Sequence, residues 1–207
     1  MVAVNKIFRL LDIALALWRG QLFLFPSLNI KLLRIYGKVS CRGSKRNIRV
    51  GDRVTFLGDA TLVCGMNLNG DLIDFGDGVI IEQGGYINSH GGAVIIGKHT
   101  FVGVGCVIQG KGVVKIGMNT LLGPYVQIYS SDHPVESSNV PRRLREEKAK
   151  SIEIGDDTWI GASSIILKGS NIKCGSVVAA GSVVRANLER CALYGSQARL
   201  VDVIREL

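Results

Sequence analysis

The sequence lacks any Cys-x-x-Cys pair, although it contains five cysteines. Without such pairs, buried thiols in a reducing compartment are favoured over disulfides or a cysteine-bound metal. Only three histidines are present, and their spacing does not suit a zinc site made by three imidazoles. We therefore expect a protein that needs no metal.

The chain also lacks an unbroken apolar run near the ~20 residues of a membrane-spanning helix. A signal peptide is disfavoured, because Arg9 and Asp12 interrupt the first apolar stretch and no small-residue cleavage site follows it. We expect a cytoplasmic protein, with a location at the inner face of the membrane as a further expectation.

Acidic residues are scarce at the N-terminus. Residues 1–50 carry ten lysines and arginines against Asp12 alone, a net charge of +9, whereas residues 51–207 carry fifteen against sixteen acids, a net charge of −1. Such a distribution favours a surface contact by the N-terminal segment over nucleic-acid binding by the body.

The same segment is apolar at helical spacing over residues 7–18, so residues 1–45 are predicted to form a helical, basic and apolar arm. Two interpretations are open. The arm packs on an open end of the fold and covers unpaired strand edges, or residues 1–37 lie on an anionic membrane surface.

What the sequence has in abundance is a six-residue repeat. Its aliphatic positions are Ile154, Ile160, Ile166, Ile172, Val178 and Val184, and a small hydroxyl residue follows four positions after each of the first five: Thr158, Ser164, Ser170, Ser176 and Ser182. A period of six fits neither an α-helix nor a lone amphipathic strand and is typical of a β-solenoid.

The same spacing extends upstream in groups of three. The upstream triplets are Val50/Phe56/Leu62, Phe75/Ile81/Ile87, Ile96/Val102/Ile108 and Ile116/Leu122/Ile128. Irregular spacings fall only between triplets, which indicates three flat sides per coil with insertions at one corner. We predict an all-β, parallel β-helix of about six triangular coils over residues 46–188, with one long projecting loop at 134–151 and a tail at 189–207.

Two stretches resemble a known family. VVKIGMNTLLGPYVQIYSSDHPV (113–135) and IEIGDDTWIGASSIILKGSNIKCGSVVAAGSVV (152–184) are similar to the hexapeptide-repeat acyltransferases, which include galactoside, maltose and polysaccharide O-acetyltransferases. The resemblance covers about residues 50–200. It implies a left-handed β-helix, acetyl-CoA as acyl donor, and a homotrimer with coenzyme A lying between neighbouring prisms.

His133 is the expected catalytic residue. It stands where the chain leaves the prism for the charged loop, and in the family the histidine of this Asp-His-Pro element is the general base. An imidazole can take the proton of a sugar hydroxyl as that oxygen attacks a thioester. Asp132 is expected to orient His133 or bind the acceptor, or else only to cap the turn.

The resemblance also implies where the donor binds. The backbone amide of Ala162 is expected to stabilise the oxyanion, and Gly161 either lets a ligand approach the backbone or merely serves the repeat. The residues that match the family's coenzyme A contacts are Trp159, Gly161, Ala162, Ala180, Arg185 and Arg199. The two arginines suit the nucleotide phosphates.

The acceptor site departs from the family. Galactoside-type enzymes place an asparagine and an aspartate one coil before the histidine, where this chain has Gly103 and Lys111. A free galactoside or maltose is therefore not the expected acceptor. Candidate sugar contacts are Asn88, Tyr125, Gln127 and Tyr129.

We expect an O-acetyltransferase acting on a cell-surface polysaccharide or its precursor. Two alternatives stay open at this point. One is N-acylation of an amino-sugar nucleotide on the same scaffold, and the other is a structural solenoid without catalytic activity.

Overall fold

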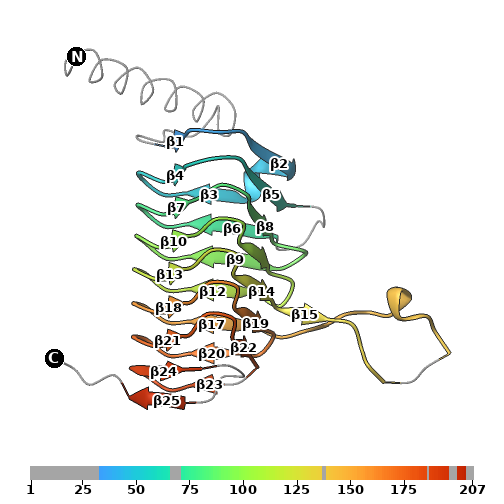
Figure 1. The fold of residues 1–207 in the computed structure, drawn as a ribbon. Helices are drawn as coiled ribbons and strands as arrows, with labels where there is room; N and C mark the ends of the chain where they lie inside the picture. The colour runs from blue at the N-terminus through green and yellow to red at the C-terminus, as the bar shows by residue number, and fades with distance from the viewer. Residues whose placement is uncertain (1–32, 66–70, 137–138, 186, 196–199, 204–207) are drawn as a thin grey trace, which may run out of the picture.

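The computed structural model describes residues 33–65, 71–136, 139–185, 187–195 and 200–203. These residues form a column of stacked strands with one long loop projecting from its side (Figure 1). Residues 1–32 of the arm predicted to be helical lie outside the described residues, and so does Arg199. The last residues of the arm, from 33 onward, are described. Within the described ranges no helix is long and apolar enough to cross a membrane.

Three parallel sheets form the faces of a triangular prism, and each coil of the chain contributes one strand to each sheet. Sheet A contains β1 (Arg34–Ile35), β4 (Thr55–Phe56), β7 (Ile80–Ile81), β10 (Phe101–Val102), β13 (Leu121–Leu122), β18 (Trp159–Ile160), β21 (Val177–Val178) and β24 (Ala192–Tyr194), with β25 (Leu200–Val203) antiparallel at its end. Sheet B contains β2 (Val39–Gly43), β5 (Ala60–Cys64), β8 (Gly85–Asn88), β11 (Val107–Gln109), β14 (Gln127–Tyr129), β19 (Ile165–Leu167) and β22 (Val183–Val184). Sheet C contains β3 (Ile48–Val50), β6 (Leu72–Phe75), β9 (Ala93–Ile96), β12 (Val114–Ile116), β17 (Ile152–Ile154), β20 (Asn171–Ile172) and β23 (Asn187–Leu188).

The coils are numbered from β1, so that coil 1 holds β1–β3, coil 5 holds β13, β14 and β17, and coil 6 holds β18–β20. We name the prism's edges by the sheets that meet there: AB, BC and CA. In the described residues the only helical segments are two 3₁₀ turns, η1 (Lys45–Asn47) and η2 (Arg142–Leu144).

The predicted left-handed β-helix is confirmed, with about seven coils in place of about six. The additional coil begins at Arg34, upstream of the expected boundary at residue 46, and β1 and β2 pair in parallel with β4 and β5. This coil was not predicted, because Ile35 and Cys41 make only a pair at the six-residue spacing and lie in the segment assigned to the helical arm. Downstream, β24 continues sheet A into the expected tail.

The six-residue period determines the interior as predicted. All six aliphatic residues of the main repeat are buried, and so are the five hydroxyl residues between them. Buried hydroxyls need hydrogen-bond partners, and the turn carbonyls supply them. For example, the Ser164 and Ser182 hydroxyls both donate to the Ala179 carbonyl, at 3.0 and 2.6 Å.

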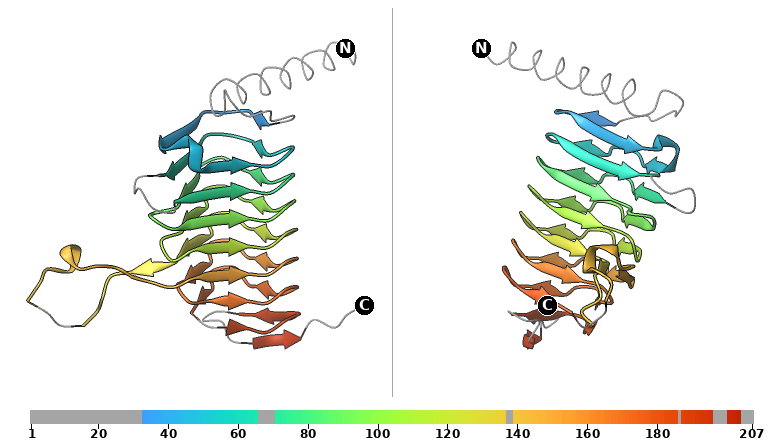
Figure 2. Two further views of the ribbon diagram at one scale, coloured as in Figure 1. Left: turned by 180° about the vertical axis from the view of Figure 1, so that it is seen from behind. Right: turned by 90° about the vertical axis from the view of Figure 1, so that its right-hand side faces the viewer.

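Insertions occur at the BC edge, as the irregular spacings predicted. The largest is the projecting loop, which begins with β15 (Ser131–Asp132) and returns through β16 (Lys148–Ala149). These two strands pair antiparallel and form the root of the loop (Figure 2). The fold thus places His133 at the root of the loop, on the BC edge of coil 5.

Candidate active site

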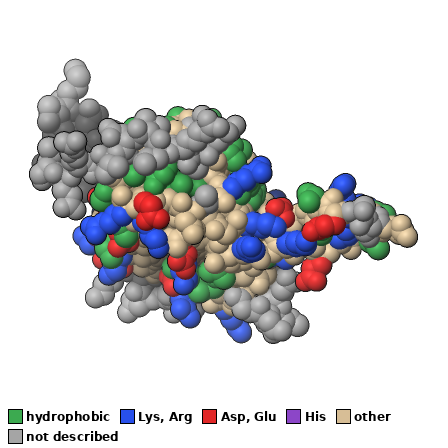
Figure 3. Space-filling model, turned by 90° about the horizontal axis from the view of Figure 1, so that it is seen from below, with side chains coloured by type: hydrophobic (Ala, Val, Ile, Leu, Met, Phe, Trp, Pro, Cys, Tyr) green, Lys and Arg blue, Asp and Glu red, His purple; other side chains and the backbone are tan. Residues whose placement is uncertain are grey.

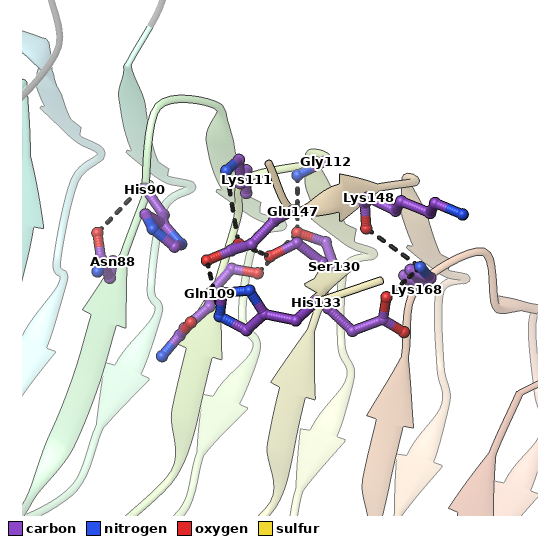
Figure 4. Close-up of polar contacts among 12 residues, drawn as sticks. Asn88, His90, Gln109, Lys111, Gly112, Ser130, His133, Glu147, Lys148 and Lys168 are labelled. Carbon is purple, nitrogen blue, oxygen red and sulfur yellow. Dashed lines mark hydrogen bonds and ion pairs between the residues drawn. The ribbon is translucent and has the colours of Figure 1, made fainter. Parts of the chain in front are cut away.

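His133 lies beside Glu147 across the root of the projecting loop (Figure 4). Its Nε2 atom is 3.9 Å from Oε1 of Glu147, and half of its side chain is exposed. The register of the hairpin explains the contact: Asp132 pairs with Lys148, so the next positions along the two strands are His133 and Glu147. Cross-strand neighbours of this kind have side chains close together on one face.

The carboxylate of Glu147 is held from its other side. The Ser131 hydroxyl donates a 2.7 Å hydrogen bond to Oε2, and Nζ of Lys111 lies 3.6 Å from the same oxygen. The hydrogen bond from Ser131 lowers the pKa of Glu147 most; the charges of Lys111, His90 and His133 add to this, while burial opposes it. Glu147 is therefore an ionised, oriented acceptor whose Oε1 atom faces the imidazole.

Asp132 does not contact His133. Successive side chains of a strand point to opposite faces, and Asp132 forms an ion pair with Lys168 from the following coil. The carboxylate next to the imidazole is that of Glu147, whereas Asp132 was the residue expected to orient His133. Glu147 was missed because it stands fourteen residues away, inside a charged loop, and only the hairpin register brings it to His133.

Four of the expected donor-binding residues gather at the AB edge of coils 6 and 7. Trp159 points outward from β18 with 51% of its surface exposed, Gly161 and Ala162 follow it, and Ala180 occupies the position of Ala162 one coil further on. Within the described part of the chain, neither the Ala162 nor the Ala180 backbone N–H donates a hydrogen bond. Two unpaired amides thus lie beside an exposed indole.

Gly161 is explained by the stacking of coils. A Cβ atom at this position would lie 2.4 Å from the backbone nitrogen of Ala180. The glycine is therefore needed for the approach of the next coil, whether or not a ligand binds there.

The imidazole and the free amides lie on different edges of the same protomer. Ala162 precedes the sheet B strand of its coil at the AB edge, whereas His133 follows the sheet B strand of coil 5 at the BC edge. A three-residue strand alone spans about 10 Å. One protomer therefore does not bring its own base next to its own amide.

The expected sugar contacts are spread over the surface. Asn88, Gln127 and Tyr129 lie on the outer side of sheet B, where the Tyr129 hydroxyl donates to Oε1 of Gln127 at 2.9 Å. Tyr125 lies at the AB edge with 57% of its surface exposed, whereas His133 lies at the BC edge. Lys111, noted in the sequence only as a departure from the family, is the charged residue that the structure brings to Glu147.

The remaining expected coenzyme A contact, Arg185, is exposed directly after β22. Among the residues that the structure describes, no group of three or more histidine, cysteine or acidic side chains is arranged to hold a metal ion.

Comparison with known proteins agrees with this architecture. A family model described as "Hexapeptide repeat of succinyl-transferase" matches residues 93–114 and 151–186. A candidate acetyltransferase of Saccharomyces cerevisiae is 36% identical over 132 residues, covering 63% of this chain and 65% of that protein. WbbJ of Escherichia coli K12, described as a candidate O-acetyl transferase of lipopolysaccharide biosynthesis, is 32% identical over 42% of this chain and 49% of its own length.

Among solved structures, a hexapeptide-repeat acetyltransferase of Vibrio cholerae in complex with acetyl-CoA is 35% identical, with a TM-score of 0.50. The match covers 55% of this chain and 61% of that one. The chain thus spans less than two thirds of the length of these relatives. Repeat, relatives and fold together confirm the resemblance to the hexapeptide-repeat acetyltransferases.

Proposed function

We propose that the protein is an acetyl-CoA-dependent O-acetyltransferase acting on a sugar hydroxyl of a cell-surface glycan or its precursor. The observation that carries this proposal is the half-exposed His133, placed against the ionised Glu147 at the root of the projecting loop. The acetyl-CoA complex of the V. cholerae neighbour supports the donor, and the description of WbbJ supports the acceptor class.

In the proposed reaction, the hydroxyl oxygen of the acceptor attacks the thioester carbonyl as Nδ1 of His133, the ring nitrogen that does not face Glu147, takes its proton. Oε1 of Glu147 orients the ring and favours the imidazolium that forms. A backbone N–H of Ala162 donates to the oxyanion of the tetrahedral intermediate. The intermediate collapses with loss of the coenzyme A thiolate, which receives the proton from His133.

The reaction requires a second copy of the chain, because the base and the amide lie on different edges. We place His133 of one protomer against the AB edge of a neighbour, with acetyl-CoA between them, in a homotrimer. Exposed apolar side chains support such an interface. Leu121 and Trp159 are exposed on sheet A, and Val135, Val140 and Leu144 are exposed on the projecting loop.

We place the reaction in the cytoplasm, where acetyl-CoA is available as donor. The departure at Lys111 argues for an acceptor other than a simple galactoside, since a cation there replaces the family's acidic residue.

A thiol-release assay tests the proposal. Purified protein is incubated with acetyl-CoA and, in separate arms, with lipopolysaccharide-type glycans, neutral oligosaccharides and nucleotide amino sugars. Release of free coenzyme A with alkali-labile acetyl ester on a glycan is the expected result. Acetylation only of the amino sugar would assign N-acylation, and no release in any arm would contradict an acetyltransferase function.

A further inference from the structure

The first coil carries most of the net charge of the solenoid. Residues 34–53 contain seven lysines and arginines against Asp52 alone, a net charge of +6. Residues 54–203 contain thirteen against fourteen acids, a net charge of −1. Such a concentration of one sign on a single coil marks a surface that attracts anions.

Four of these cations surround the BC edge of coil 1. Arg42 lies on β2, Lys45 and Arg46 lie on η1, and Arg49 lies on β3; all four are exposed. We call this set the basic edge. Arg49 has an acidic neighbour, Asp74, with its Nη1 atom 3.9 Å from Oδ2 of that residue.

Other parts of the column present both signs of charge. Lys98 pairs with Asp77 at 2.9 Å, and Lys115 lies 4.0 Å from Glu153. At the C-terminal end, basic and acidic side chains are interspersed (Figure 3). The basic edge is thus a local feature of the N-terminal end.

The basic edge and the candidate base share one edge of the prism. η1 lies between β2 and β3, as the projecting loop lies between β14 and β17, and both are on the same side of the column (Figure 1). The basic edge is on coil 1 and His133 is on coil 5, an offset of four coil steps. At about 4.8 Å per coil, His133 stands about 19 Å from the basic edge along the column.

The chain that precedes this coil has the composition of a lipid-binding segment. Residues 1–32 contain four lysines and arginines against Asp12, together with apolar stretches such as IFRLLDIALALW. Clustered cations beside an amphipathic apolar segment suit an anionic lipid surface. A soluble acidic polysaccharide would need the cations but not the apolar residues.

We propose that the basic edge docks on anionic phospholipid headgroups, so that the column stands with coil 1 at the membrane and His133 about 19 Å from it. The docking itself does not depend on the proposed function, but its role in presenting an acceptor to His133 rests on that function. A lipid-linked glycan several sugars long could then reach the base while its lipid stays in the bilayer.

Vesicle flotation of the full-length chain tests the docking. The vesicles contain phosphatidylcholine alone or phosphatidylcholine with phosphatidylglycerol. The wild type should float with the anionic vesicles at low salt and less at high salt, because the screening length falls from about 10 Å at 0.1 M to about 3 Å at 1 M. The variant Arg42→Glu/Arg46→Glu should partition at least about tenfold less, since each basic residue near the surface contributes attraction.

The control variant is Lys173→Glu/Arg190→Glu, which makes the same change of charge on exposed residues at the opposite end of the column. It should float like the wild type. Equal flotation of the Arg42/Arg46 variant and the wild type would overturn the proposal. A second outcome would also overturn it: the wild type does not bind the vesicles but binds an immobilised acidic polysaccharide, and the Arg42→Glu/Arg46→Glu variant does not bind that polysaccharide. The basic edge would then be a glycan site.

Turnover of a water-soluble acceptor separates this proposal from the enzymatic one. The Arg42→Glu/Arg46→Glu variant should keep wild-type turnover, because these residues lie four coils from His133. A wild type that floats but acetylates nothing would count against the proposed function and leave the docking intact.

Discussion

Glu147 Oε1 lies 3.9 Å from His133 Nε2, and the hairpin formed by β15 and β16 is what brings the two side chains together. The other oxygen of the carboxylate is occupied by Ser131 and Lys111. Glu147 thus has one oxygen anchored to the solenoid and one directed at the imidazole. In the proposed reaction, this arrangement orients the ring for proton transfer.

Replacement of Glu147 by glutamine should lower kcat with little change in the KM for acetyl-CoA. The amide keeps the size of the side chain but loses the charge that favours the imidazolium. We expect a fall of roughly tenfold or more, though less than the ~10²–10⁴-fold that general-base catalysis supplies. Glu146→Gln, at an exposed neighbouring position, is the matched control. Equal steady-state constants for the two variants would argue against an orienting role.

Replacement of His133 by alanine should remove most of the turnover, by about 10²–10⁴-fold, because no other group accepts the proton of the hydroxyl. Calorimetric binding of acetyl-CoA should persist, since the imidazole is not a donor contact. His99→Ala, which removes an exposed histidine from another edge, should stay active. Turnover of the His133 variant close to that of wild type would refute its assignment as the base.

Acid should weaken the root of the loop by an amount that depends on Ser131. Because the pKa of Glu147 is lowered in the folded protein, its ionised form stabilises the fold. That contribution is fully present above the ordinary glutamate value of about 4.3 and is lost as the pH falls through the lowered value.

The variant Ser131→Ala removes the largest cause of the shift, so its loss of stability on acidification should still begin near the ordinary glutamate value but should be smaller and end at a higher pH than in wild type. Thermal unfolding between pH 3 and pH 7 measures the difference, with Ser151→Ala as a control whose hydroxyl makes no contact with Glu147. Superimposable pH profiles for wild type and Ser131→Ala would show that this hydrogen bond does not set the titration of Glu147.

Two glycines at the AB edge should respond differently to alanine. At Gly161 a Cβ would meet the Ala180 backbone at 2.4 Å, whereas at Gly181 it would meet nothing within 4 Å, and the cost there comes from a φ of +70°. Left-handed backbone costs an alanine about 1–2 kcal/mol. Gly161→Ala should therefore lower the thermal midpoint by clearly more than Gly181→Ala. The reverse order would mean that the coils do not approach each other as the structure shows.

Much of the fold was predictable because each coil repeats the same physical requirement. A solenoid buries one aliphatic and one small residue every six positions, so the interior hydrophobic residues from Val50 to Val184 can be identified from their spacing. Coil 1 was not predicted, because Ile35 and Cys41 make only a pair at this spacing and lie in the segment assigned to the helical arm. Complete triplets were recognised even across the long insertions.

The candidate site was predictable only in part. The position of His133 at the root of the loop was predictable, because it stands at the start of a charged excursion; its catalytic role stays a prediction from the family motif. The position of Glu147 was not predictable, because it depends on how the two ends of that excursion pair. Ala162 and His133 lie on different edges because Ala162 follows a strand of sheet A and His133 follows a strand of sheet B.

The division of the site between protomers is the central claim, and complementation of two inactive variants tests it most directly. One variant is His133→Ala, and the other is Ala162→Pro, which removes the amide donor. Proline fits this corner one coil earlier, where Pro124 aligns with Ala162.

The His133→Ala variant alone should be inactive, and the turnover of the Ala162→Pro variant alone should be reduced by about 10²–10³-fold. After co-refolding at equal amounts, random trimers would pair an intact His133 with a neighbour's intact Ala162 amide at one site in four, so we predict about a quarter of wild-type activity. A mixture no more active than the separate variants would contradict a site shared between protomers.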